Sequence, residues 1–199
     1  MSSSLNNLSS TEKRETSGIW LDDVEIIPSS HFDERSNNYS GEKDISLLVI
    51  HNISLPPAQK EEDFNNSNVE LFFTGKLDET AHPYFYQIKD LRVSAHLYIK
   101  RCGNVVQFVP LNKRAWHAGV SEFNGMKACN NFSIGIELQG TDTLSYTNAQ
   151  YQSLVRVTKQ IQLLYPNVIN EHIVGHEHIA PERKTDPGPS FDWTRYKSA

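Results

Sequence analysis

The strongest constraint on the fold comes from two short segments in the middle of the chain. Residues 45–50, Ile-Ser-Leu-Leu-Val-Ile, form an almost continuous apolar run, which is typical of a strand buried on both faces. Residues 132–138, Phe-Ser-Ile-Gly-Ile-Glu-Leu, alternate with the period of two that a strand requires. A central strand buried on both faces needs cover on both sides of its sheet. We therefore expect an α/β or α+β fold with a mixed central sheet and helices packed on it.

Further periodic patterns predict the elements around that sheet. They are a β-hairpin at 93–100 and 105–109, helices at 69–73, 83–88 and 147–165, a strand at 172–176 and a helical turn at 191–196. The longest helix is the best marked, because Thr147 and Gln150 form a capping-box pattern at its start. No internal repeat accompanies these elements, so we expect a single folded domain over residues 17–199.

The ends and the charge of the chain exclude several classes of protein. Residues 1–16 are rich in Ser and Asn and lack any period, which predicts a flexible N-terminal tail. A net charge of −5 argues against a nucleic-acid partner, which would require clustered Lys and Arg. No apolar run approaches the roughly 18 residues that a membrane span needs. The N-terminus lacks the pattern of a signal peptide, so we expect a cytoplasmic protein.

The proline-rich loop from residue 174 to 189 carries the first candidate metal ligands, His176 and Asp186. Imidazole and carboxylate both suit zinc, and a hydrolytic zinc site uses three protein ligands and leaves a fourth position open. His51, at the end of the predicted central strand, is a candidate third ligand. Each residue also has a simpler interpretation: His176 and Asp186 as a hydrogen-bonded loop pair, and His51 as a partner for backbone groups. His178 is a competing ligand near His176.

Other residues suggest chemistry near such a metal. Glu137 lies on the alternating strand, and its neighbours on the same face are too small to obstruct a ligand. Lys184 lies two residues before Asp186, so an extended loop would direct both side chains the same way. Trp116 is either a core residue or a surface on which a sugar ring stacks. Cys102 and Cys129 are too few for a disulfide framework and lack the surroundings of a nucleophile.

These segments together resemble the type-2 N-acetylmuramoyl-L-alanine amidases, whose fold is shared with peptidoglycan recognition proteins. The resemblance runs from about residue 20 to residue 196 and is carried by residues 48–57, 92–96, 114–120, 132–138 and 175–189. It implies one zinc ion per chain, held by His51, His176 and Asp186. It also implies that Glu137 and Lys184 form the catalytic pair. In addition, activity should depend on Tyr84.

The resemblance is closest to members of the family that act in cytoplasmic peptidoglycan recycling. It implies hydrolysis of the amide bond between the lactyl group of 1,6-anhydro-N-acetylmuramic acid and L-alanine, by a monomer acting on small anhydro-muropeptides. We expect substrate contacts from Trp116, Arg92, Asn52 and His117. In this mechanism Glu137 accepts a proton from water and passes it to the leaving amine, while Lys184 stabilises the oxyanion.

One departure from the family pattern affects the substrate contacts, and two other functions remain open. Ala128 and Asn131 occupy the positions at which the most similar members carry Arg and Asp. Because the arginine is missing, the sequence does not show which residue binds the carboxylates of the peptide. The chain could instead be an amidase acting on intact peptidoglycan. It could also be a peptidoglycan-binding module without turnover, although such modules typically lack one zinc ligand.

Overall fold

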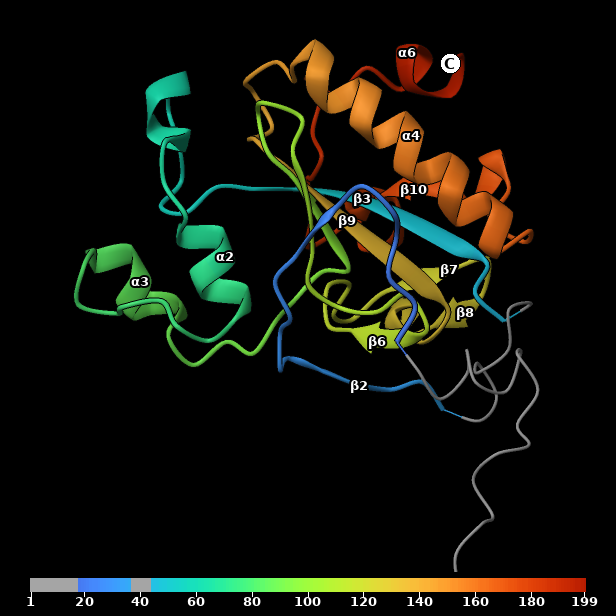
Figure 1. The fold of residues 1–199 in the computed structure, drawn as a ribbon, viewed down its shortest axis with the longest axis horizontal. Coiled ribbons are helices and arrows are strands. Elements are labelled where there is room, and N and C mark those ends of the chain that lie inside the picture. Colours follow the sequence, from blue (N-terminus) through green and yellow to red (C-terminus); the bar gives the residue numbers. More distant parts are fainter. Residues whose placement is uncertain (1–17, 37–43) are drawn as a thin grey trace, which may run out of the picture.

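The computed structural model describes residues 18–36 and 44–199, and its centre is a six-stranded mixed sheet (Figure 1). The strands, in the order in which they pair, are β1 (Glu25–Ile26), β5 (Val105–Gln107), β4 (Leu97–Ile99), β9 (Ser133–Gln139), β3 (Leu47–Ile53) and β10 (Ile173–Gly175). β10, β3, β9 and β4 run parallel to one another, and β5 is antiparallel to β4. The mixed sheet and the hairpin are thus confirmed. The tail predicted for residues 1–16 lies outside the described residues.

Helices and two small sheets surround the central sheet. They are α2 (Asn68–Phe73), α3 (Pro83–Ile88), α4 (Asn148–Leu164), α5 (His176–Ile179) and α6 (Trp193–Lys197), with the pairs β2 (Phe32–Glu34) and β6 (Lys113–Ala115), and β7 (Glu122–Phe123) and β8 (Met126–Lys127). The capping box at α4 is present as predicted: the Thr147 hydroxyl accepts from the Gln150 amide, and the Gln150 side chain accepts from the Thr147 amide. α4 lies across one side of the sheet, while α2 and α3 lie away from α4 and pack beside the hairpin strands β4 and β5 (Figure 1).

The two faces of the central strands have different neighbours. On one face Ile50 and Ile136 join a buried cluster that includes residues of α4. On the other face Val49 packs in a second cluster with Ile179 of α5. His51 is two residues after Val49 and therefore faces this second side, as does its register partner on β9, Glu137. The face away from α4 is consequently the one that receives the chemically active side chains.

Phe132 departs from the predicted alternation. The sequence pattern places it on the same face as Ile134, yet it packs with Val49 and Ile179 on the opposite face. The reason is local: Phe132 ends the short 3-10 helix Cys129–Asn131 with φ −127° and ψ 14°, which is not an extended conformation. The strand alternation therefore begins only at Ser133.

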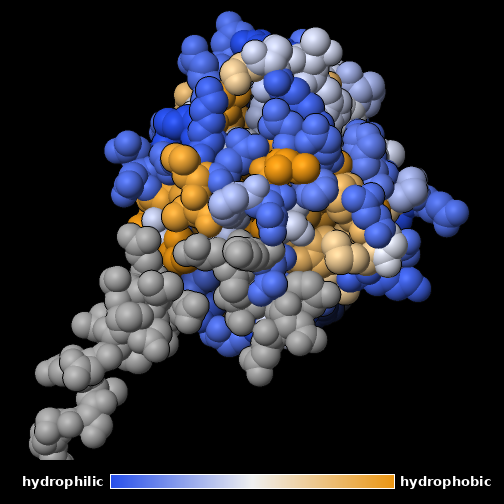
Figure 2. Space-filling view, turned by 90° about the vertical axis from the view of Figure 1, so that its right-hand side faces the viewer, coloured by the Kyte–Doolittle hydropathy of each residue, from blue (hydrophilic) through white to orange (hydrophobic). Residues whose placement is uncertain are grey.

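The surface carries hydrophobic residues in patches separated by hydrophilic ones, as the face in Figure 2 shows. Val120 and Leu163 are the most exposed of the large hydrophobic residues in the described ranges, at 87% and 84%. Within those ranges the structure contains no helix with the length and apolar character that crossing a membrane requires.

A buried arginine ties the start of β9 to the loops beneath it. Arg35 is 5% exposed, and its guanidinium donates through Nη1 to the carbonyls of Asn130 and Asn131, at 3.0 and 2.9 Å. Through Nη2 it donates to the carbonyls of Leu111 and Ser133, at 3.2 and 2.8 Å. Burial lowers the pKa of Arg35 to about 10, so the group is still charged at neutral pH. Its charge is compensated by carbonyl dipoles.

Replacing this arginine should strongly destabilise the fold. Arg35→Met leaves four carbonyl acceptors without their donor, and each unsatisfied buried group costs about 1–3 kcal/mol. We expect the free energy of unfolding in urea to fall by at least about 3 kcal/mol. Lys159→Met, on the exposed face of α4, is the control and should change it by less than about 0.5 kcal/mol. Equal effects of the two substitutions would contradict this role for Arg35.

Candidate metal centre

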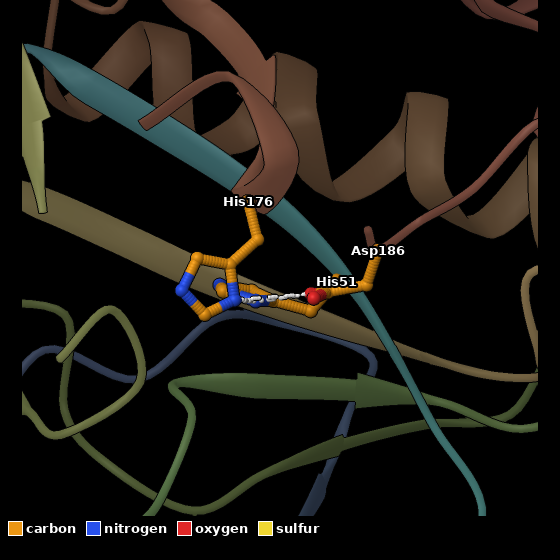
Figure 3. A group of neighbouring side chains, drawn as sticks. All are labelled: His51, His176 and Asp186. Carbon is orange, nitrogen blue, oxygen red and sulfur yellow. Dashed lines mark hydrogen bonds and ion pairs between the residues drawn. The ribbon is translucent and has the colours of Figure 1, made fainter. Parts of the chain in front are cut away.

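Three side chains from separate elements meet at the carboxyl ends of β3 and β10 (Figure 3). His51 lies on β3, and His176 begins α5 directly after β10, whose Gly175 pairs with Ile50 of β3. Asp186 comes from the proline-rich loop. The Nδ1 atoms of His51 and His176 are 2.9 Å apart, and Oδ2 of Asp186 lies 2.9 Å from the first and 3.1 Å from the second. The structure thus brings together the three predicted ligands.

The chemistry of this donor set fits a divalent cation. Burial lowers the pKa of His51 to about 4, although its contact with Asp186 opposes this, so at neutral pH the imidazole keeps a free lone pair. Burial raises the pKa of Asp186, but the close contacts with His176 and His51 lower it by more and hold the group anionic. Three lone-pair donors therefore converge, and together they suit zinc. Among the described residues, this is the group that meets the geometric requirements of a metal site.

The outer nitrogens of the two histidines are also bonded. Nε2 of His176 lies 3.0 Å from the backbone carbonyl of Ala118, which can only accept. Arg183 Nη2, a donor, also lies near this nitrogen but farther away, at 3.4 Å, so the closer carbonyl favours a proton on Nε2 and a bare Nδ1 facing the centre. Nε2 of His51 lies 3.0 Å from Nδ1 of His117. Such outer contacts orient metal-binding imidazoles.

Glu137 lies beside this group in a buried position. Its Cα is the register partner of that of His51, and the residue is 8% exposed. Burial raises the pKa of Glu137 well above its ordinary value, the charge of Asp186 raises it further, and Lys184 opposes both. Its Oε2 atom has no hydrogen-bond partner among the described residues. A buried carboxyl oxygen without a partner is free to bind a ligand or a water molecule.

A cleft of about 570 Å³ opens over these side chains. Its lining includes nine of the ten predicted site residues: His51, His176, Asp186, Glu137, Lys184, Tyr84, Trp116, Asn52 and His117. Arg92 is the predicted site residue that lies elsewhere. It is exposed and lines a separate hollow, and Trp116 lines both this hollow and the cleft. A carboxylate contact from Arg92 stays a prediction, and it would require a substrate that extends past Trp116.

The space over Glu137's small neighbours is filled, contrary to the sequence-based expectation. A Cβ atom on Gly135 would lie 2.4 Å from Cγ of His117, so the glycine makes room for the imidazole ring. Ser133 reaches the same ring, with its Oγ 3.1 Å from His117 Nε2. These small residues accommodate a side chain of the protein itself, and an approaching ligand meets Glu137 from the cleft.

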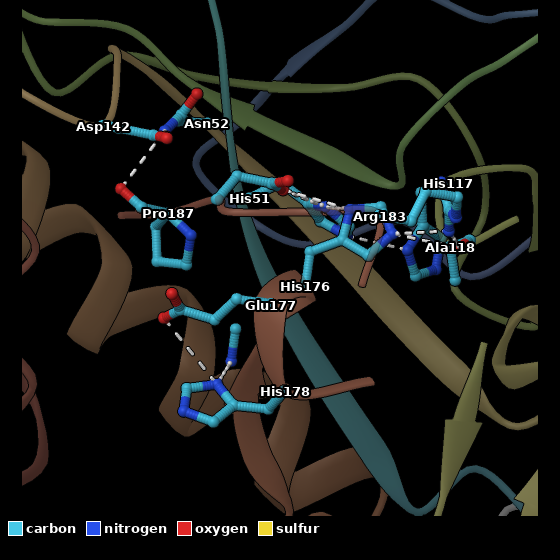
Figure 4. A network of polar contacts seen from close by, with 12 residues as sticks. His51, Asn52, His117, Ala118, Asp142, His176, Glu177, His178, Arg183 and Pro187 are labelled. Carbon is cyan, nitrogen blue, oxygen red and sulfur yellow. Dashed lines mark hydrogen bonds and ion pairs between the residues drawn. The ribbon is translucent and has the colours of Figure 1, made fainter. Parts of the chain in front are cut away.

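The structure places other predicted residues in supporting positions. The Asn52 amide donates to Asp142 Oδ1 at 2.7 Å and to the Pro187 carbonyl at 3.1 Å, which joins the strand end to two loops (Figure 4). His178, the predicted competitor of His176, has a half-exposed side chain and accepts from the Gly175 amide at 3.0 Å. The chain turns helical at His176, so His178 points away from the centre (Figure 4).

The sequence did not predict two residues near the site, Asp142 and Arg183. Asp142 lines the cleft just beyond the end of β9. Its position could have been found, since ligands bind beyond the carboxyl ends of parallel strands. Arg183 donates to the carbonyls of Ala118 and Val120, at 2.7 and 2.9 Å, and so ties the metal loop to the loop after β6. No periodic or compositional signal marks Arg183.

Comparison with known proteins shows the family to which the chain belongs. The family described as N-acetylmuramoyl-L-alanine amidase matches residues 41–189, and the chain belongs to this family. It is 54% identical over 179 residues to the 1,6-anhydro-N-acetylmuramyl-L-alanine amidase AmpD of Citrobacter freundii, which covers 90% of this chain and 91% of that one.

Solved structures give the same relationship. A crystal structure of a selenomethionine derivative of AmpD superposes with a TM-score of 0.83 at 53% identity, covering 90% of this chain and 95% of that chain. The amidase AmiD of Escherichia coli, solved with the substrate anhydro-N-acetylmuramic acid-L-Ala-D-γ-Glu-L-Lys, gives 0.58 at 26% identity, covering 85% and 66%.

The close fit between Gly135 and His117 leads to a prediction about stability. Gly135→Ala should lower the free energy of unfolding by about 1–3 kcal/mol, because the added methyl group overlaps the ring. In a His117→Ala background the same substitution should cost less than half as much, because the ring is gone. Urea unfolding of the four proteins measures this coupling. Equal costs in both backgrounds would show that the ring does not occupy this space.

Proposed function

We propose that this protein is a zinc amidase that hydrolyses the bond between the lactyl group of 1,6-anhydro-N-acetylmuramic acid and L-alanine in anhydro-muropeptides. The observation that carries the proposal is the position of Glu137, which is buried beside the His51, His176 and Asp186 donors and has one oxygen without a partner in the described part of the chain. A relative more than half identical over nine-tenths of both chains bears the name of this activity, which supports the choice of substrate. On this proposal the protein acts in peptidoglycan recycling.

His51, His176 and Asp186 would hold the zinc ion. When bound there, zinc supplies Lewis acidity that polarises a carbonyl group and lowers the pKa of a water molecule. Burial and the charge of Asp186 raise the pKa of Glu137, which makes it a stronger base than an exposed carboxylate. We assign to Glu137 the transfer of a proton from water to the leaving amine.

Lys184 and Tyr84 would complete the chemistry from the cleft wall. Lys184 lines the cleft with Glu137 and Asp186, and it is half-buried. An ammonium group there can stabilise the negative oxygen that develops when the carbonyl is attacked. Tyr84, near the start of α3, lines the same cleft and is the remaining residue on which we expect activity to depend.

The substrate contacts follow from the shape of the cleft. Trp116 donates through its indole nitrogen to Asp33 at 3.0 Å, which fixes the ring at the border of the cleft. A ring held in this way offers a stacking surface for the anhydro sugar. A single small-molecule substrate fits these dimensions. The monomeric state and the cytoplasmic location stay predictions from the sequence.

Substitution of the catalytic pair tests the assigned roles. Glu137→Gln should lower kcat by about 10²–10⁴-fold, because the amide cannot accept the proton. Lys184→Met should lower kcat by about 10²–10³-fold with little change in KM, because its interaction forms in the transition state. Release of the peptide from a purified anhydro-muropeptide gives the rates, and zinc content is measured on the same samples. Full turnover by zinc-loaded Glu137→Gln would refute the role of Glu137.

The identity of the substrate needs its own test. We expect rapid release of peptide from soluble anhydro-muropeptides and at least about tenfold slower release from polymeric peptidoglycan, since a cleft of about 570 Å³ suits a ligand of small-molecule size. Equal rates would favour an amidase of intact peptidoglycan. Binding of fragments without any turnover by the zinc-loaded protein would favour a binding module.

A further inference from the structure

Ser133, His117 and His51 form a continuous hydrogen-bonded chain that ends at the metal centre. Oγ of Ser133 lies 3.1 Å from Nε2 of His117. Nδ1 of His117 lies 3.0 Å from Nε2 of His51, and Nδ1 of His51 faces His176 and Asp186. We propose that His117 is a positioning residue that, with Ser133, holds His51 in the orientation and tautomer that bind the metal. This inference rests on the proposed function, in which His51 is a zinc ligand.

The direction of the hydrogen bonds follows from the ligand role of His51. An imidazole that binds a cation through Nδ1 carries its single proton on Nε2. That proton is donated to Nδ1 of His117, so the proton of His117 is on its own Nε2 and is donated to Ser133 Oγ. The reverse direction would place a proton on His51 Nδ1, where the metal must bind. Only one of the two directions is compatible with a metal ligand.

The two histidines of the centre differ in how their tautomers are set. His176 bonds to the Ala118 carbonyl, which accepts and never donates. His51 bonds to another imidazole, which can do either. His117 can accept from Nε2 of His51 only when its own proton is on Nε2, its other ring nitrogen. The Ser133 hydroxyl can accept that proton, so it gives this tautomer of His117 a hydrogen-bond partner, and the ligand role of His51 sets the direction.

The surroundings of His117 hold the ring firmly in place. Its backbone amide and that of Ala118 both donate to Oδ1 of Asn130, at 3.1 and 2.8 Å. The ring packs over Gly135, where a Cβ atom would overlap it. It also meets the ring of His51 edge to face, with centroids 5.1 Å apart and an interplanar angle of 82°. A group fixed in this way costs little entropy when it orients its neighbour.

The sequence suggested a substrate contact for His117, and the two roles differ in a measurable way. A positioning residue changes the affinity for metal when no substrate is present. A substrate contact changes KM and leaves the affinity for metal unaltered. The dissociation constant for zinc, measured on the metal-free protein by competition with a chromophoric chelator, therefore separates the two roles and requires no activity.

We expect His117→Phe to raise the dissociation constant for zinc by about 10–100-fold, as is typical when the outer partner of a metal-binding histidine is lost. His117→Asn should recover most of this loss, because the amide oxygen can occupy the position of Nδ1 and accept from His51. Ser133→Ala should weaken zinc binding less than His117→Phe does. His172→Phe, which alters a histidine outside the cleft lining, is the matched control and should leave zinc affinity unchanged.

Each outcome supports or overturns the inference. Wild-type affinity in both His117→Phe and Ser133→Ala, with a raised KM, overturns it and makes His117 a substrate contact. Failure of the wild-type protein to bind zinc overturns the inference and the proposed function together. Far-UV circular dichroism of the metal-free variants establishes that they are folded. If His117→Phe does not fold, weaker zinc binding by Ser133→Ala than by wild type supports the inference, and equal binding overturns it.

Discussion

The site depends on the parallel pairing of β3 with β9 on one side and with β10 on the other. This register places the Cα of His51 opposite that of Glu137 and brings His176, the residue after β10, to the same sheet edge. Parallel strands end at a common edge, so three segments far apart in the sequence deliver their side chains to one place. Of the three candidate ligands, Asp186 comes from a loop, and the Asn52 amide donates to the neighbouring Pro187 carbonyl at 3.1 Å.

The two faces of β3 and β9 have different roles: one packs in the apolar core, and the other carries side chains of the candidate site. The face toward α4 is apolar, and residues such as Ile50 and Ile136 bury against the helix. The opposite face collects His51, Glu137 and His117, which are largely withdrawn from water. Burial lowers the pKa of both histidines and raises that of Glu137, so the imidazoles are neutral at pH 7. Neutral imidazoles and a basic carboxyl group are the forms that metal-assisted hydrolysis requires.

Local sequence patterns predicted most of the fold because they report on local structure. Thr147 with Gln150 indicates the start of the longest helix, and the capping box is found there. The short helix predicted over residues 83–88 is also present, with Pro83 as its first residue. The three candidate ligands were also predicted, and the resemblance to an amidase family raised that prediction above what His176 and Asp186 could support alone. The family itself is confirmed by the match over residues 41–189.

What the sequence could not supply was the placement of side chains that depends on long-range contacts. The alternation predicted from Phe132 onward is wrong at that residue, because Phe132 ends a turn of 3-10 helix and its side chain points to the opposite face of the sheet. The small neighbours of Glu137 predict space for a ligand, yet the side chain of His117, from a distant loop, fills that space. Arg35 donates hydrogen bonds to four backbone carbonyls, and no local sequence pattern predicts this role.

The most direct test of the proposed metal centre is anomalous diffraction at the zinc absorption edge from crystals of the zinc-loaded protein. We expect a single strong peak per chain, within about 2.0–2.2 Å of His51 Nδ1, His176 Nδ1 and a carboxylate oxygen of Asp186. A peak bound by other residues, or no peak between these three side chains at full zinc loading, would contradict the proposed centre.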